Sequence, residues 1–198
     1  TITFMDNTGL AYNENGDLKL NSNEIATGRR LTFSVADDKA GVKFVKYNGA
    51  IITADSDGNY TINADYSKDN TIEFADLVGN TDSYTIAKDT TEDIGNLTII
   101  EPKFSRTTLS FNVSYVNNEI NIHRSMDNLC YALTTTQNVN DSDFKLLTKS
   151  GTPTFELDMN NENLGDLYRG NYYLHVRVVD MAGNKSAIKT QAMYYTNP

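Results

Sequence analysis

The chain has 198 residues, of which 39% are hydrophobic and 10% aromatic, so it can form a buried core and is not a disordered, highly charged chain. Its 17 basic and 26 acidic residues give a net charge of -9, which argues against nucleic acid as a partner because phosphate binding needs a basic surface. No apolar run approaches the roughly 18 residues of a membrane helix, so we expect no membrane insertion. The single cysteine excludes an internal disulfide bond.

Apolar and polar residues alternate in short segments through the first half of the chain. Leu31, Phe33 and Val35 form the first clear run, and this period of two is typical of β-strands. Turn sequences such as Asn48-Gly49 and Asp57-Gly58-Asn59 separate the runs, as they do in β-hairpins. The segments that we expect to form strands here are 31–35, 42–45, 60–62 and 72–74.

The second half has longer runs of the same kind. Segments 109–115 and 172–178 alternate and are predicted to be central strands with one face in a core. Segment 128–133 is also strand-like, and we expect Cys130 within it to be a small buried hydrophobic residue. Short strands at this spacing indicate an all-β sandwich or barrel and not a parallel sheet covered by helices.

An internal repeat relates the two halves. The segment 72–80 aligns with 176–184, and both contain the sequence Asp-x-x-Gly-Asn, with Asp76 and Asp180 104 positions apart. This offset is the length of one small sandwich domain, so we expect two copies of one architecture. A polar stretch between the copies indicates a linker. The predicted domains are residues 1–90 and 96–198, joined by a linker at 91–95.

The end of each half, an alternating strand followed by Asp-x-x-Gly-Asn and another strand, resembles the last hairpin of bacterial immunoglobulin-like and fibronectin type III-like modules. Segments 41–49 and 57–62 are similar to middle strands of that family, and the resemblance covers nearly the whole chain. It implies an all-β fold of two tandem immunoglobulin-like antiparallel β-sandwich domains. In that family, the Asp and the Gly-Asn form the turn between the last two strands.

The core departs from that of antibody domains, which pack a tryptophan against a disulfide bond. This chain has no tryptophan and one cysteine, so apolar residues must take those places. Tyr172 stands two residues before Leu174, which is the spacing of a tyrosine corner to the second bridge cysteine. The resemblance therefore implies that Leu174 occupies the missing cysteine position, with a partner near Phe111 or Val113.

Catalytic motifs are absent from the sequence. It contains no nucleophile elbow, phosphate-binding loop or metalloprotease helix. Neither His123 nor His175 lies in a nucleophile or metal motif, and alternation places His175 on the outward face of its strand. We therefore expect that the chain is not an enzyme.

The resemblance implies a spacer, stalk or adhesive segment of a bacterial secreted or cell-surface protein. The chain begins at Thr1 with neither an initiator methionine nor a signal peptide, so we interpret it as an excerpt joined to neighbouring domains of a longer chain. Its partner would be a host or cell-wall protein or glycan. The alternative is a carbohydrate-binding accessory module of a secreted multidomain enzyme, with tyrosine rings as stacking platforms. The tyrosines near the C-terminus are Tyr168, Tyr172, Tyr173, Tyr194 and Tyr195.

Acidic residues around the predicted linker are candidate calcium ligands. In an immunoglobulin-like sandwich the loop before the penultimate strand, here 64–70, lies at the end where the chain leaves the domain. Acids of the second domain near Glu119 and Asp180 would approach from across the linker. A calcium ion takes six to eight oxygen ligands and could clamp such a joint, whereas the alternative is a set of solvated linker residues. The candidate ligands are Asp65, Asp69, Asp89, Glu92 and Asp93.

Overall fold

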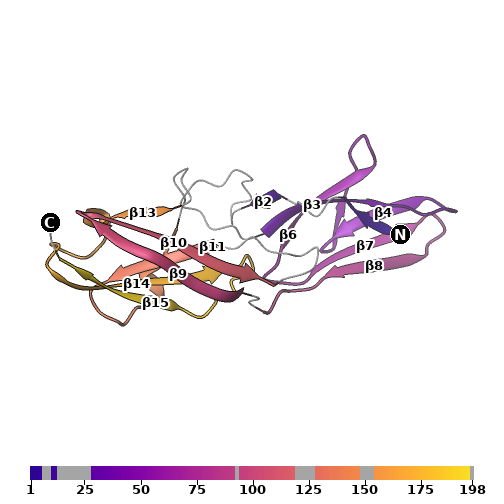
Figure 1. The fold of residues 1–198 in the computed structure, drawn as a ribbon. Coiled ribbons are helices and arrows are strands. Elements are labelled where there is room, and N and C mark those ends of the chain that lie inside the picture. Colours follow the sequence, from indigo (N-terminus) through magenta and orange to yellow (C-terminus); the bar gives the residue numbers. More distant parts are fainter. Residues whose placement is uncertain (6–9, 13–27, 92–93, 119–127, 148–153, 197–198) are drawn as a thin grey trace. The chain divides into compact units, whose positions relative to one another are not determined.

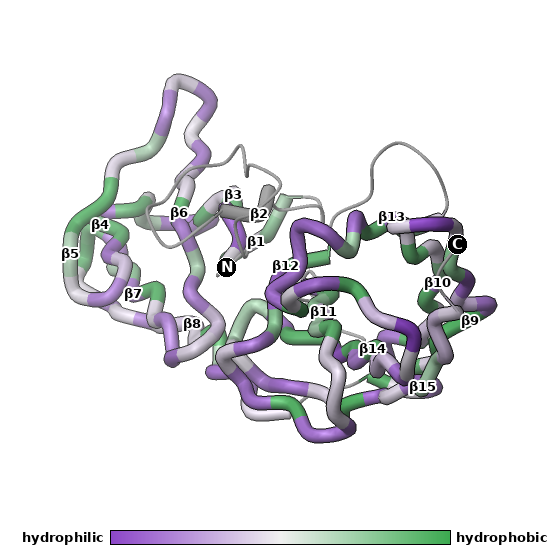
Figure 2. Tube along the Cα trace, turned by 90° about the vertical axis from the view of Figure 1, so that its left-hand side faces the viewer, coloured by the Kyte–Doolittle hydropathy of each residue, from purple (hydrophilic) through white to green (hydrophobic). Residues whose placement is uncertain are grey.

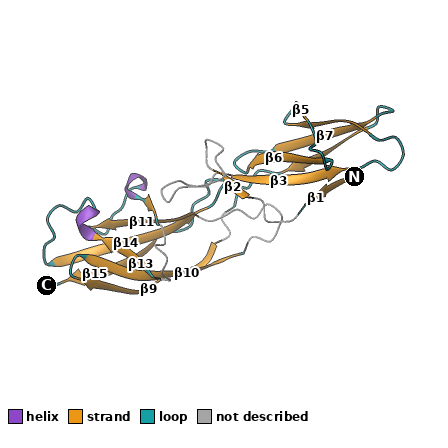
Figure 3. Cartoon of the chain, turned by 90° about the horizontal axis from the view of Figure 1, so that it is seen from above, coloured by secondary structure: helices purple, strands orange, loops and turns teal. Residues whose placement is uncertain are grey.

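The computed structural model describes residues 1–5, 10–12, 28–91, 94–118, 128–147 and 154–196. Residue contacts divide the chain into two units. The first unit is Thr1–Thr91 together with Asp180–Asn184, and the second holds the other described residues. Strands dominate both, and the described helices are two short 3-10 turns, η1 (Asp141–Asp143) and η2 (Met159–Asn161) (Figure 3). No helix in these ranges is long and apolar enough to cross a membrane.

Two antiparallel sheets make up the first unit (Figure 1). In one sheet β3 (Gly28–Val35) lies in the middle, with β6 (Asn59–Asp65) along one edge. The short strands β1 (Ile2–Phe4) and β2 (Leu10–Tyr12) pair with successive parts of the other edge of β3. The second sheet has the order β5-β4-β7-β8. Its strands are β4 (Val42–Tyr47), β5 (Ala50–Ile52), β7 (Asn70–Asp76) and β8 (Thr81–Ile86).

The core of the first unit follows the alternation seen in the sequence. Leu31 and Phe33 of β3 are buried in one cluster with Ile62 of β6 and Ile72 of β7. The Phe33 ring stacks on the ring of Tyr60, with 5.6 Å between centroids. Figure 2 shows hydrophobic and hydrophilic positions following one another along these strands. The other buried members of the cluster are Val45, Ala64, Tyr66, Phe74, Ile86 and Met181.

The second unit repeats this strand order. One sheet runs β13-β10-β9 and the other β12-β11-β14-β15, with all pairs antiparallel. They correspond to the first unit's β6-β3-β1/β2 and β5-β4-β7-β8. This is an immunoglobulin-like sandwich order, so the predicted fold class is confirmed. The strands are β9 (Ile94–Ser105), β10 (Thr108–Asn117), β11 (Asn128–Thr134), β12 (Lys145–Leu146), β13 (Phe155–Asp158), β14 (Gly170–Val179) and β15 (Lys189–Tyr195).

The core of the second unit contains the residues expected to replace the disulfide bond. Phe111 and Leu174 are buried in one cluster, and the half-buried Val113 packs against it. Tyr172 forms the predicted tyrosine corner: its hydroxyl donates to the carbonyl of Tyr168 at 3.0 Å and accepts from the Tyr168 N–H at 3.1 Å. This pair of hydrogen bonds ties the segment before β14 to the strand itself.

The edge strand β9 pairs irregularly with β10. The register slips beside Glu101 and again beside Asn96, where β9 holds one residue more than its partner. Both residues have positive φ angles, +48° for Glu101 and +53° for Asn96. An extra residue in a left-handed conformation on one strand of an antiparallel pair is a β-bulge, so β9 is bent at two places.

Candidate functional site

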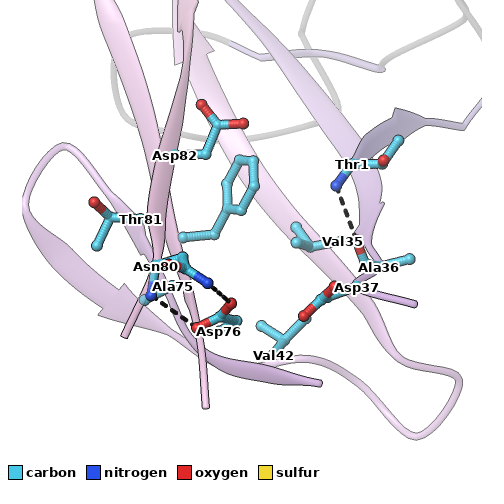
Figure 4. A pocket seen from close by; sticks show the side chains of 11 residues that line it. Thr1, Val35, Ala36, Asp37, Val42, Ala75, Asp76, Asn80, Thr81 and Asp82 are labelled. Atoms are coloured by element: carbon cyan, nitrogen blue, oxygen red, sulfur yellow. Dashed lines mark hydrogen bonds between the residues drawn. The ribbon is translucent and has the colours of Figure 1, made fainter. Parts of the chain in front are cut away.

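The two turns that follow β7 and β14 have the same hydrogen bonds. In each, the Asp N–H donates to the Asn carbonyl at 3.0 Å, and the Asn N–H donates to Oδ1 of the Asp at 2.8 Å. The Asn side-chain amide donates to Asp Oδ2, at 2.6 Å in the 76–80 turn (Figure 4) and at 2.9 Å in the 180–184 turn. Gly79 and Gly183 have φ angles of +100° and +88°, which glycine adopts without strain. The predicted turn is confirmed in both copies.

A third turn of the same sequence joins β5 to β6. The Asp55 N–H donates to the Asn59 carbonyl at 2.8 Å, the Asn59 N–H donates to Asp55 Oδ1 at 2.9 Å, and Gly58 has a φ angle of +82°. The Asp-x-x-Gly-Asn sequence therefore encodes a backbone turn and leaves its two middle residues free to differ. Those pairs are Ser56-Asp57, Leu77-Val78 and Met181-Ala182.

The middle residues of the 76–80 and 180–184 turns lie in opposite environments. Met181 is 3% exposed and belongs to the buried cluster of the first unit, and Ala182 packs against that cluster. Leu77 is 64% exposed and Val78 is 76% exposed. The same backbone turn thus carries a buried methionine and a partly buried alanine in one copy and two exposed apolar residues in the other.

Within the first unit, the 180–184 turn meets the end of the segment that follows β8. The side-chain amide of Asn184 donates to the carbonyl oxygens of Asp89, at 3.4 Å, and Thr91, at 3.2 Å. Asp180 is 6% exposed. Its burial raises its pKa, hydrogen bonds from Asn184 lower it, and the charge of Asp89 raises it, with a net increase. The sequence predicts that Asp180 lies near the linker acids, and the acid whose charge acts on it is Asp89.

Two of the predicted calcium ligands lie beside the segment after β8. Asp69 Oδ1 accepts a hydrogen bond from the Lys88 N–H at 2.7 Å, and the Asp89 N–H donates to the carbonyl of Tyr66 at 3.0 Å. Asp89 Oδ2 is buried and accepts no hydrogen bond from the described residues. The loop before β7 therefore does approach the segment that follows β8, as the sequence predicted.

Asp65 is engaged inside its own loop. Its Oδ1 accepts from the N–H of Ser67 at 3.0 Å and from the Ser67 hydroxyl at 2.6 Å, and its Oδ2 lies 3.4 Å from Lys68 Nζ. Burial raises the pKa of Asp65, but the hydrogen bonds from Ser67 and Lys68 outweigh it, so the pKa is lowered overall. This carboxylate caps a turn.

The remaining predicted ligands, Glu92 and Asp93, and also Glu119, lie outside the described residues. In the part of the chain that the structure describes, no three histidine, cysteine, aspartate or glutamate side chains gather so that they could hold a metal ion. Hard cations bind oxygen ligands, and the buried Oδ2 of Asp89 has that chemistry. Calcium binding at this place stays a prediction.

His175 lies on the predicted face of β14, opposite Leu174 and Val176, but this outward face is covered and His175 is not exposed to solvent. The side chain is fully buried, with Nε2 2.9 Å from Thr134 Oγ1 and Nδ1 2.8 Å from Thr190 Oγ1. Burial lowers the pKa of His175. On the same strand, Arg177 bonds to Asp141 of η1 and lies under the Phe144 ring, so the segment after β11 covers this face. His123 lies outside the described residues.

Cys130 is buried as predicted, with 4% exposure. Burial raises the pKa of its thiol, and the charge of Arg177 lowers it, with a net increase. A thiol with a raised pKa is a poor nucleophile because little thiolate is present near neutral pH. This residue therefore acts in packing.

The C-terminal tyrosines divide into buried and exposed residues. Tyr172 and Tyr195 are buried in the core, and Tyr173 is half-buried. Tyr168 is 68% exposed and Tyr194 is 54% exposed. The guanidinium of Arg169 lies 6.0 Å from the centroid of the Tyr194 ring. Only Tyr168 and Tyr194 of this set offer open rings.

No protein-family model matches the chain, and no curated protein matches it either. Among solved structures, it is similar to the fibronectin(III)-like modules of Clostridium thermocellum CbhA, with 10% identity and a TM-score of 0.38 over 86% of this chain and 86% of that one. It is also similar to a biofilm-associated protein BSP domain, with 12% identity and a TM-score of 0.27 over 85% of this chain and 27% of that one. The immunoglobulin-like assignment rests on the strand order, register and turns of this chain itself.

Proposed function

We propose that the chain is a non-catalytic pair of immunoglobulin-like modules, residues 1–90 and 96–198 with a linker at 91–95, that serves as a spacer, stalk or adhesive segment of a bacterial secreted or cell-surface protein. The observation that carries the proposal is that one strand order and one closing turn occur twice, 104 positions apart. Repeating a complete module adds length and outer surface without requiring a cleft. The partners are neighbouring domains and a host or cell-wall protein or glycan.

The environments of the reactive side chains support a non-catalytic role. His175 has both ring nitrogens against threonine hydroxyls in a buried position, and Cys130 is a buried thiol with a raised pKa. Asp76, Asp180 and Asp55 use their carboxylates to close turns. Each of these groups contributes to the fold itself.

Mechanical unfolding of single molecules tests this function. A chain held by its two ends should unfold in two steps, and each should release roughly 30 nm, because each module has about 90 to 100 residues that extend at about 3.5 Å each. One step that releases the whole length would contradict two modules. Turnover of polysaccharide or peptide substrates by the same preparation would contradict the non-catalytic role.

A second candidate function is glycan binding, which the exposed rings of Tyr168 and Tyr194 favour. Aromatic faces stack on sugar rings, and the nearby Arg169 could donate hydrogen bonds to hydroxyl groups. A glycan array probed with the chain and with Tyr168→Ala and Tyr194→Ala tests it. Binding at micromolar concentration that both variants lose, and that the exposed-surface control Ile188→Ala keeps, would favour the accessory-module function over the spacer.

A further inference from the structure

The exposed apolar pair Leu77-Val78 has no role in forming its turn. The 55–59 turn has the same backbone hydrogen bonds and carries Ser56-Asp57, both exposed, in the corresponding positions. A polar pair is therefore sufficient for the backbone. Leu77 and Val78 are 64% and 76% exposed, so the turn presents two adjacent apolar side chains that its own backbone does not require.

The 180–184 turn shows what covers such a pair. Met181 lies in the buried cluster of the first unit, and Asn184 Nδ2 donates to the carbonyl oxygens of Asp89 and Thr91, just before β9 begins. The matching amide of Asn80 donates only to Asp76 Oδ2 among the described residues, and Asn80 is exposed. The 76–80 turn thus has an apolar pair and an asparagine amide in the same positions as the 180–184 turn, but among the described residues it lacks the covering surface and the carbonyl acceptors.

We propose that the 76–80 turn is a docking surface for the end of another immunoglobulin-like module, placed ahead of Thr1 in the same polypeptide. Leu77 and Val78 would be buried by that end as Met181 and Ala182 are buried in the first unit. Asn80 Nδ2 would donate to backbone carbonyls of the connecting segment. The inference deepens the proposed function, on which it rests, by naming the neighbour of the 76–80 turn.

Thr1, to which a preceding segment would be attached, lies at a groove that the 76–80 turn also lines. The amino group of Thr1 donates to the carbonyl of Ala36 at 2.8 Å, and Thr1 lines the same groove of about 170 Å³ as Asp76 and Asn80 (Figure 4). Residues attached to Thr1 therefore start at the groove that Asn80 also lines. The carbonyls of the first unit that accept from Asn184, those of Asp89 and Thr91, likewise precede a strand, β9, closely in the sequence.

An exchange of turn residues in the 198-residue chain tests whether Leu-Val is a docking pair. The double variant Met181→Leu/Ala182→Val should melt within about 3 °C of the parent chain, because it keeps an apolar pair at the buried position. The double variant Met181→Ser/Ala182→Asp, with the pair of the 55–59 turn, should melt at least about 8 °C lower. Equal losses in both double variants would overturn the proposal.

Occupancy is tested by adding a second copy of residues 1–93 directly ahead of the complete chain. Hydrogen exchange at residues 77–80 of the complete chain should slow at least about tenfold relative to the chain alone, because a docked end shields these amides. Leu77→Ser/Val78→Asp in the complete chain should abolish the slowing, and the control Ser56→Ala/Asp57→Ser should keep it. Slow hydrogen exchange of the β3 and β7 amides in the complete chain shows that each variant is still folded.

Two results would overturn the proposal. They are unchanged exchange at residues 77–80 after the addition of a copy whose own β3 amides are protected, and slowing that the double variant keeps. Self-association of the chain alone that is lost in Leu77→Ser/Val78→Asp would instead assign the turn to a contact between copies. Failure of the two-step mechanical unfolding, which needs no added copy, separately contradicts the proposed function.

Discussion

The 76–80 and 180–184 turns have the same backbone conformation, but their side chains differ in solvent exposure and in the residues that they contact. Their Asp, Gly and Asn residues make the same hydrogen bonds, yet Met181 is 3% exposed and Leu77 is 64% exposed. The comparison shows that turn formation and contact formation depend on different residues of the five. The three fixed residues build the turn, and the two variable residues determine what the turn contacts.

The carboxyl groups of Asp76 and Asp180 also differ, because their pKa values are shifted in opposite directions. At Asp76, desolvation is outweighed by hydrogen bonds from Asn80 and its neighbours, so the pKa is lowered. At Asp180, burial and the charge of Asp89 outweigh the same set of hydrogen bonds, so the pKa is raised. Hydrogen bonds that favour the charged form therefore give opposite results, depending on burial and on a second carboxylate nearby.

The largest expected difference between the turns is in core stability. Met181→Ala should lower the free energy of unfolding of the first unit by about 2–5 kcal/mol, because it removes a buried side chain and leaves a cavity. Leu77→Ala should change it by less than about 0.5 kcal/mol, because Leu77 is exposed. Chemical denaturation of both variants measures the difference. Equal losses would mean that Leu77 is buried in solution.

Calcium provides the next test, because the buried Asp180 has a second carboxylate, that of Asp89, beside it. If calcium binds there through Asp89 and other linker acids, the folded state gains about 2.7 kcal/mol at a hundredfold excess over Kd. Thermal melts with calcium and with a chelator should then differ in the parent chain and coincide in Asp89→Asn. Coinciding melts in the parent chain, with no heat on titration, would contradict calcium binding by these acids.

Substitution of the glycines tests the positive φ angle that the two turns have in common. Gly79→Ala and Gly183→Ala should each cost about 1–2 kcal/mol, because alanine is strained at positive φ angles. A Cβ atom at either position would meet no atom within 4 Å, so the cost should be confined to the backbone and similar in both turns. Denaturant midpoints compare the two variants. A much larger loss at Gly183 would show that packing also acts there.

The smallest effect concerns pH. Because the folded state raises the pKa of Asp180, this group destabilises the fold above its folded pKa, and the penalty is relieved as the pH falls toward the unfolded value of about 3.9. Asp89→Asn removes one cause and should lower the pKa of Asp180. Carboxyl NMR titration measures that shift directly, with Asp76 as the internal control. An unchanged Asp180 would mean that burial alone raises its pKa.

The strands and the cores could be predicted because their signal is local. Leu31 and Phe33 alternate with polar residues along β3, and Phe111 and Leu174 do so along β10 and β14, so each strand shows its buried face in its own sequence. The Asp-x-x-Gly-Asn turns were predictable for the same reason, since their hydrogen bonds close within five residues. The strands β1, β2, β5, β9, β12 and β13 were not predicted. Of these, β1, β2, β5 and β12 have only two or three residues, which are too few to show a period.

The environments of the turns could not be predicted, because they depend on residues far away in the chain. Leu77-Val78 and Met181-Ala182 are both apolar pairs, and only the bonds from Asn184 to carbonyls more than 90 positions earlier distinguish them. His175 is a similar case. Alternation identified its face, but the segment after β11 that covers this face has no periodic pattern.

The two bulges of β9 have a consequence for crowded surfaces. An edge strand of 12 residues offers a long row of unpaired peptide groups on which a strand of another molecule could be added. The left-handed residues Asn96 and Glu101 interrupt that row and divide it into short pieces. Such a strand is a poor template for intermolecular β-sheet, so molecules packed densely side by side would be protected from fusing through their sheet edges into aggregates.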